Sequence, residues 1–293
     1  MNDSNLFGRS RRECLALLAL APALAFQNNK PETADDPNDW TCPMDPDVHL
    51  NHPGNCPRCG MKLQLKIPDR IEYPMSLTVE PRAVQPGQEA RLRLRVFDPG
   101  GHQVRRFETV HEKLIHLFVI SEDLEFFAHV HPVYQADGSF VHKMVLPKPG
   151  MYRLLADYYP NGSTPQLAVE TIYVKGSSTP PQLHPSLAPQ RGDNLTASLR
   201  LEPSRMMPGL EARLYYTLEP NEGLEKYLGA WGHMLIASED LIDLMHIHPF
   251  LVNASNIQYT VIFPRAGNYK IWSQFQRLGV VNTVAFAVRV NEF

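Results

Sequence analysis

From Tyr73 onward, apolar and polar residues alternate in short runs that are separated by turn-forming residues. Met75 to Glu80 alternates in this way, Pro86-Gly87 follows, and Ala90 to Phe97 then carries an arginine at every second position. A period of two is typical of a β-strand with one buried face. The chain also contains 26 prolines, which helix interiors tolerate poorly. The pattern therefore predicts an all-β protein made of short strands.

The second half of the chain repeats the first. Residues 116–157 align with residues 233–274 at a constant offset of 117 without a gap, and 11 of the 42 aligned positions are identical. Two copies of about 100 residues with many short strands are typical of tandem Ig-like β-sandwiches, and a cupredoxin-like sandwich is the alternative. We place repeat 1 at 70–175, a proline-rich linker at 176–193 and repeat 2 at 194–293.

Three of the identical positions are histidines. Each H-x-H sequence places two imidazoles on one face of a strand, and a hairpin partner can bring the third to the same face. Neutral imidazoles suit Cu(II), Zn(II) or Ni(II), so the two triads are candidate metal sites; the alternative is that they are hydrogen-bonded structural residues. Met234 and Met245 are expected to add thioethers near the second triad. The triads are His116, His129 and His131 in repeat 1, and His233, His246 and His248 in repeat 2.

A cysteine-rich segment precedes the repeats. Three of the chain's four cysteines, Cys42, Cys56 and Cys59, follow the spacing C-x13-C-x2-C, with His49 and His52 between them. About thirty residues bury too little apolar surface to fold alone, so such a segment relies on a metal or a disulfide. An odd number of cysteines fits a disulfide framework poorly, and a redox C-x2-C pair would lack its usual βαβ context. The segment therefore favours a small metal-binding knuckle.

The motifs of this segment resemble, over residues 40–63, the short heavy-metal-binding domain of copper and silver efflux proteins, and we place the domain at 40–67. The chain has Trp40-Thr41-Cys42-Pro43-Met44-Asp45-Pro46 and then Pro53-Gly54-Asn55-Cys56-Pro57-Arg58-Cys59-Gly60-Met61-Lys62-Leu63. Asp45 stands where the family has histidine, so the fourth ligand is Asp45, His49 or His52. Thiolates with the thioethers of Met44 and Met61 favour Cu(I) or Ag(I), and Zn(II) also suits thiolate and imidazole.

The N-terminus has the pattern of an export signal. Arg9, Arg11 and Arg12 precede the apolar run Cys14 to Ala21 and an A-x-A sequence that ends at Ala25. We expect a signal peptide at 1–25, with cleavage after Ala25, and a linker at 26–39. Ser10 to Leu15 resembles a twin-arginine signal, with Cys14 where phenylalanine is usual. The apolar run is too short for a bilayer core of ~30 Å, so an uncleaved anchor is the weaker alternative and the mature chain has no predicted transmembrane segment.

Composition and motifs exclude several functions. The formal net charge of −3 gives no basic excess for nucleic acid. The chain lacks a nucleophile elbow, a phosphate-binding glycine loop and an H-E-x-x-H sequence, and His111, Glu112 and Asp157 are isolated polar residues. The sequence thus predicts a non-enzymatic, periplasmic or extracytoplasmic protein that binds Cu(I)/Cu(II) or Zn(II). The resemblance to the heavy-metal-binding domain implies that its role would be to sequester the metal or to deliver it to an exporter or another envelope protein. The alternatives are an envelope interaction module with a structural zinc knuckle and a copper-dependent redox enzyme.

Overall fold

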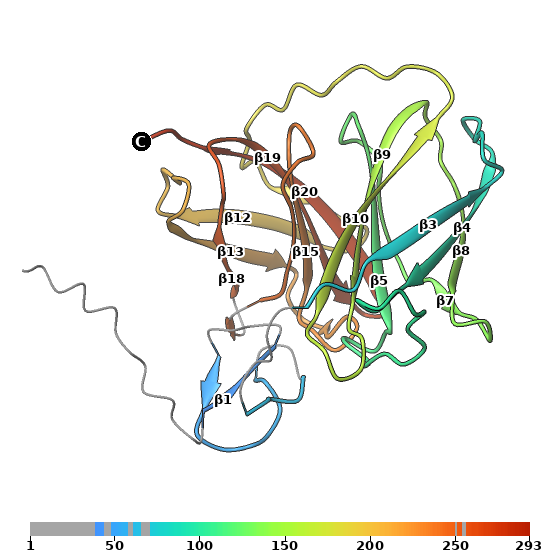
Figure 1. The fold of residues 1–293 in the computed structure, drawn as a ribbon. Coiled ribbons are helices and arrows are strands. Elements are labelled where there is room, and N and C mark those ends of the chain that lie inside the picture. The colour runs from blue at the N-terminus through green and yellow to red at the C-terminus, as the bar shows by residue number, and fades with distance from the viewer. Residues whose placement is uncertain (1–38, 44–47, 58–60, 66–70, 250, 254–255) are drawn as a thin grey trace, which may run out of the picture. The chain divides into compact units, whose positions relative to one another are not determined.

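The computed structural model describes residues 39–43, 48–57, 61–65, 71–249, 251–253 and 256–293, all within one compact unit of the chain. Every regular element in these residues is a β-strand (Figure 1), as the alternating pattern predicted. The described residues hold no helix that is long and apolar enough to cross a membrane. The predicted signal peptide and most of the linker after it lie outside the described residues.

Repeat 1 is a sandwich of two four-stranded antiparallel sheets. One sheet has the order β3-β4-β8-β7 and the other has the order β10-β9-β5-β6. Named as in immunoglobulins, these are an A-B-E-D sheet and a G-F-C sheet extended by strand C′. The strands are β3 (Met75–Glu80), β4 (Glu89–Val96), β5 (Ile115–Ser121), β6 (Phe127–Val130), β7 (Val133–Tyr134), β8 (Phe140–Val145), β9 (Gly150–Tyr158) and β10 (Gln166–Val174).

Repeat 2 has the same topology. Its first sheet has the order β11-β12-β13-β18-β17, and in its second sheet β20, β19, β15 and β16 are neighbours, with β14 beside the end of β19. The two tandem Ig-like sandwiches predicted from the repeat are therefore present. The strands are β11 (Gln190–Arg191), β12 (Thr196–Glu202), β13 (Glu211–Glu219), β14 (Leu224–Glu225), β15 (His233–Ser238), β16 (Leu244–Ile247), β17 (Leu251–Asn253), β18 (Asn256–Ile262), β19 (Gly267–Arg277) and β20 (Val280–Val290).

Each repeat has a tyrosine corner, a feature of Ig-like domains at the start of strand F. The Tyr152 hydroxyl at the start of β9 donates to the Lys148 carbonyl oxygen over 3.0 Å. The Tyr269 hydroxyl at the start of β19 lies 2.9 Å from the Arg265 carbonyl oxygen. Both rings are fully buried, so each bond ties the connection before the strand to the core. The corner occupies aligned positions in the two repeats.

The G-F-C-C′ sheets of the two repeats pack against each other through a third hydrophobic core. Every residue of β5 is buried: Ile115, Leu117 and Val119 face the core of repeat 1, whereas Phe118 and Ile120 belong to the core between the repeats. β15 is likewise buried throughout. Across this interface Phe127 of repeat 1 stacks on Trp272 of repeat 2, with ring centroids 5.2 Å apart. One face of each central sheet is thus covered by the other repeat.

The cysteine-rich segment forms a small sheet of β1 (Trp40–Thr41) and β2 (His49–Leu50). Thr41 also pairs with Gln64, and the Leu63 amide donates to the Gly54 carbonyl oxygen, which closes the knuckle. Its buried residues form a cluster with two residues of repeat 1, so the segment is packed onto the first sandwich. The cluster contains Cys42, Cys56, Met61, Leu63, Val110 and Tyr159.

Candidate metal centre

Strand register brings each histidine triad to the interface between the repeats. In the β5–β6 hairpin Phe118 lies opposite His129, and in the β15–β16 hairpin Leu235 lies opposite His246. His116 is two residues before Phe118 and therefore points to the same face as His129. That face belongs to the interface between the repeats, so the two triads lie next to each other there. The centroids of the His116 and His233 rings are 5.7 Å apart.

The repeat 1 triad has the spacing of a metal site. His116 Nδ1 lies 3.0 Å from His129 Nε2 and 3.2 Å from His131 Nε2. One nitrogen of each ring lies within 4.8 Å of the others. A tetrahedral ion with metal–nitrogen bonds of ~2.0–2.1 Å would hold its ligands ~3.3 Å apart. The three imidazoles are therefore arranged much as an ion would require.

Hydrogen bonds fix the tautomers of two of these rings. His116 Nε2 donates to the Val110 carbonyl oxygen over 3.0 Å, and His129 Nδ1 donates to Gln274 Oε1 over 2.7 Å. Gln274 directs this oxygen at His129 because its amide nitrogen bonds Thr283 Oγ1. In the neutral rings, His116 Nδ1 and His129 Nε2 are then both acceptors. The lone pairs of these two nitrogens therefore face each other, which is unfavourable. A cation bound between the nitrogens would accept both lone pairs.

The repeat 2 triad has equivalent contacts. His233 Nδ1 lies 3.4 Å from His246 Nε2 and 3.2 Å from His248 Nε2. His233 Nε2 donates to the Tyr227 carbonyl oxygen over 3.0 Å, and Tyr227 is the residue aligned with Val110. An N–H bonded to a backbone carbonyl is the usual arrangement of a metal-ligating histidine. The central histidine of each triad therefore bonds a backbone carbonyl oxygen at aligned positions.

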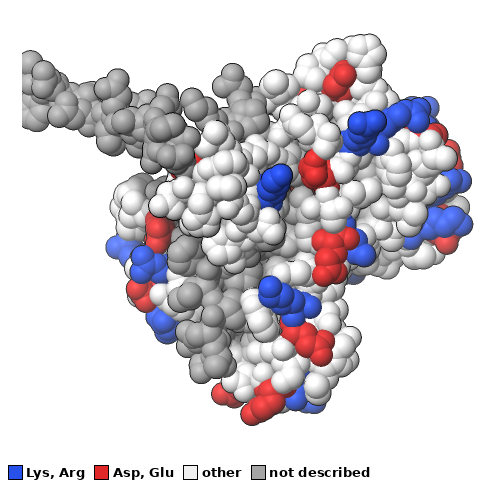
Figure 2. All heavy atoms as spheres, turned by 90° about the horizontal axis from the view of Figure 1, so that it is seen from below, with Lys and Arg blue, Asp and Glu red and all other residues white. Residues whose placement is uncertain are grey.

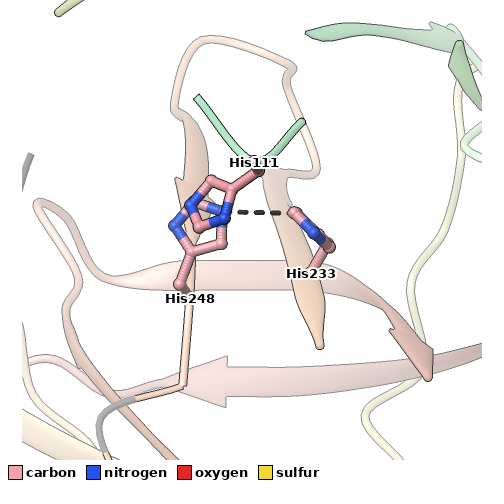
Figure 3. A group of neighbouring side chains, drawn as sticks. All are labelled: His111, His233 and His248. Carbon is pink, nitrogen blue, oxygen red and sulfur yellow. Dashed lines mark hydrogen bonds between the residues drawn. The ribbon is translucent and has the colours of Figure 1, made fainter. Parts of the chain in front are cut away.

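A seventh histidine, which in the sequence is only an isolated polar residue, joins the second triad. His111 comes from repeat 1, and its ring lies 3.9 Å, between centroids, from that of His248, with His233 facing them both (Figure 3). One nitrogen of each of these three rings lies within 4.8 Å of the others. Within the described residues neither nitrogen of the buried His111 ring has a hydrogen-bond partner, although the nearby Leu228 backbone acts to raise the pKa of this ring.

Two further residues hold the histidines from across the interface. Asp157 Oδ2 accepts from His246 Nδ1 over 2.7 Å, and both side chains are almost completely buried. Asp157 in repeat 1 and Gln274 in repeat 2 are aligned positions, so each repeat orients one histidine of the other. In the sequence Asp157 is an isolated polar residue, and nothing in the local pattern marks Gln274. Asp157 lies directly opposite His116 on the neighbouring strand, and Gln274 lies directly opposite His233. This pairing is the signal that could have identified both residues as part of the centre.

Burial keeps the histidines in the neutral form that binds metal. It lowers the pKa of His116 to about 4 and that of His111 to about 3, and electrostatic repulsion from the neighbouring His246 ring acts in the same direction. Burial also lowers the pKa of the half-buried His131 to about 3. The pKa values of His129, His233 and His248 lie well below the usual range, again first because of burial. At neutral pH these six rings offer lone pairs without first releasing a proton.

The methionine expectation for this centre is wrong. Met234 is buried in the core of repeat 2, and Met245 packs against the same core. Both methionines are sequence neighbours of triad histidines, and adjacent residues of a strand point to opposite faces. The centre therefore consists of imidazoles supported by an amide, a carboxylate and backbone carbonyls.

The structure describes part of the predicted cysteine site. Cys42, Cys56 and Met61 are buried together. His49 Nδ1 instead bonds Asp39 Oδ1 over 2.8 Å, and His52 Nδ1 lies 3.0 Å from the Pro53 carbonyl oxygen. Met44, Asp45 and Cys59 lie outside the described residues. The fourth ligand of this site thus stays a prediction.

Residues 70–175 and 190–292 both match one family, described as a domain of unknown function, DUF8832. The chain belongs to this family. Residues 40–66 match the heavy metal binding domain, which confirms the resemblance found in the sequence. The DUF8832 repeats therefore follow a heavy metal binding segment in one chain. No curated protein matches this chain.

Solved structures resemble the chain only distantly. The Escherichia coli adhesin FdeC is 13% identical with a TM-score of 0.28, over 80% of this chain and 68% of that one. The Yersinia pseudotuberculosis adhesin InvE is 11% identical with a TM-score of 0.25, over 74% of this chain and 58% of that one. Red sea bream transglutaminase is 12% identical with a TM-score of 0.24, over 75% of this chain and 31% of that one. TM-scores this low give no basis for assigning a function.

Proposed function

We propose that this DUF8832 protein is an exported, non-enzymatic metal-binding protein of the cell envelope that sequesters copper-type heavy-metal ions or delivers them to an exporter. The observation that carries the proposal is the contact between His116 Nδ1 and His129 Nε2, two acceptors held 3.0 Å apart. Protein interiors avoid such contacts because neither nitrogen can donate to the other. An ion bound by both nitrogens is the simplest arrangement that satisfies them.

The heavy metal binding segment supports metal handling rather than a purely structural role for the histidines. The Val110 side chain packs in the same cluster as Cys42 and Cys56, while its carbonyl oxygen holds His116. A single residue thus contacts the thiol-bearing cluster and the imidazole centre. Transfer of an ion between soft thiolate ligands and imidazole ligands within one molecule fits this arrangement.

Surface charge fits a small inorganic ligand better than a nucleic acid. On the face drawn in Figure 2, basic and acidic residues are interspersed among uncharged ones, with no continuous basic stripe. Recognition of a phosphate backbone would require such a stripe. Export is supported by the arginine-rich and apolar N-terminal sequence.

Metal analysis of the full-length protein, purified without added metal, tests the proposal. We expect copper or zinc in the isolated protein and copper binding after chelation. The variant His116→Ala/His129→Ala should lose ions of the histidine centre but keep the ion of the cysteine segment, because the two ligand sets are separate. The matched control is His102→Ala, which changes a histidine of an exposed turn. A full-length protein that binds neither copper nor zinc would refute metal handling and favour an interaction module.

A further inference from the structure

The two halves of the histidine centre are not equivalent, although a duplication created them. His111 has no counterpart, because the position aligned with it in repeat 2 is Leu228. Both residues have positive φ, 48° and 50°, so the backbone is the same and only the side chain differs. The second triad thus gains a fourth imidazole where the first has an aliphatic side chain at the aligned position.

The halves also differ in burial. His111, His233 and His248 are each at most 6% exposed. In the first triad His116 is also buried, but His131, which is aligned with His248, is only half-buried. His129 and His246 do not differ in this respect, because both residues are partly buried. Solvent can therefore approach the first triad more readily than the second.

The supporting groups differ in charge. His246 of the second triad donates to the carboxylate of Asp157, whereas His129 of the first triad donates to the neutral amide of Gln274. A carboxylate behind a ligating imidazole makes the ligand more basic and adds a negative charge next to the ion. The second half is thus the stronger binding site for a divalent cation.

From these differences we propose that the centre binds two transition-metal ions in unlike sites. In the closed site His111, His233 and His248, whose nitrogens lie within 4.8 Å of one another, would hold the ion. His246, whose Nε2 lies 3.4 Å from His233 Nδ1, would supply the fourth imidazole. The open site, formed by His116, His129 and His131, leaves a fourth position for an exogenous monodentate ligand. Sites with four protein ligands retain their metal, and sites with three keep a position for water or another ligand. This inference rests on the proposed function and assigns the exchangeable ion to the open site.

The experiment uses the full-length chain with Cys42, Cys56 and Cys59 changed to serine, so that only the histidine centre binds. Cu(II) is titrated against the metal-free protein, and azide is then added as a probe of open positions. We expect two Cu(II) ions per chain and one azide-to-copper charge-transfer band, because azide replaces a ligand such as water at the open site alone. A chelator should remove the azide-sensitive ion at least about tenfold faster than the other.

Two substitutions act on one site each. His131→Ala should abolish the azide band and leave one bound ion. The variant His111→Ala should still bind two ions, but azide should now bind at both of them instead of one, because the substitution removes a ligand from the closed site. The matched control is His142→Ala, a half-buried histidine outside both ligand sets, which should leave stoichiometry and azide binding unchanged. If His131→Ala fails to fold by circular dichroism, His131→Gln replaces it.

The results separate this inference from the proposed function. If the chain with these three serines binds no Cu(II), the histidine centre has no metal function, and both the inference and the histidine part of the proposal fail. If it binds one ion, or two that respond alike to azide, unlike sites are refuted while metal binding stands. If His111→Ala leaves the azide band unchanged, the assignment of a fourth ligand to the closed site is overturned.

Discussion

Acidification should destabilise the metal-free protein well before the carboxylates titrate. His116 has a pKa of about 4 in the native protein against 6.5 in the unfolded chain, because the folded ring is buried. Below pH 6.5 the His116 ring is protonated in the unfolded chain but stays neutral in the native state. The free energy of unfolding therefore falls as the pH falls. The gap of roughly 2.5 pH units for this one ring corresponds to about 3 kcal/mol, lost between about pH 6.5 and about pH 4.

The slope of stability against pH reports how many rings behave in this way. One histidine kept neutral contributes at most about 1.4 kcal/mol per pH unit. Six rings of the histidine centre have lowered pKa values, so the measured slope should be steeper than that of one ring until protonation unfolds the chain. Asp240, whose pKa is lowered from 3.8 to about 2, contributes stability that is lost only below this range.

Urea unfolding of chelator-treated protein at several pH values measures this slope. His116→Leu should reduce it by about one histidine's contribution, since leucine binds no proton in either state. Saturating copper should steepen the acid loss, because protons then compete with the ion for the same nitrogens. A free energy of unfolding that stays constant from neutral pH to about pH 4.5 would refute the claim that the folded centre excludes protons.

Three further predictions concern the fold and the cysteine segment. Tyr152→Phe should lower the free energy of unfolding by about 1 kcal/mol, because it removes the bond to the Lys148 carbonyl oxygen; an unchanged urea midpoint would contradict this. Trp272→Ala should lower it by about 3–5 kcal/mol through loss of the ring stacked on Phe127, measured by urea unfolding; a smaller loss than for Tyr152→Phe would show that the interface contributes little. Cys56→Ser should remove the soft ion of the segment and leave the histidine-bound copper, by metal analysis and thiol titration; loss of both would show one shared site.

The sequence by itself determined the local structure. Alternation of apolar and polar residues specifies a strand with one buried face, and the offset of 117 residues specifies two copies of the same sandwich. The H-x-H spacing places His129 and His131 on one face for the same reason. The cysteine motif identified the heavy metal binding segment, because its spacing is itself the family's pattern. These features depend on residues that are near one another in the chain or on an alignment of the chain with itself.

Only the tertiary structure decided what the second face of each central sheet does. β5 is buried on both faces because it belongs to its own core and to the interface between the repeats. Strand periodicity cannot distinguish a face that meets solvent from one that meets another domain. The pairing of His129 with Gln274, 145 residues away, depends on how two separately folded sheets pack. For the same physical reason, the position of His111 beside the second triad could not be derived from spacing along the chain.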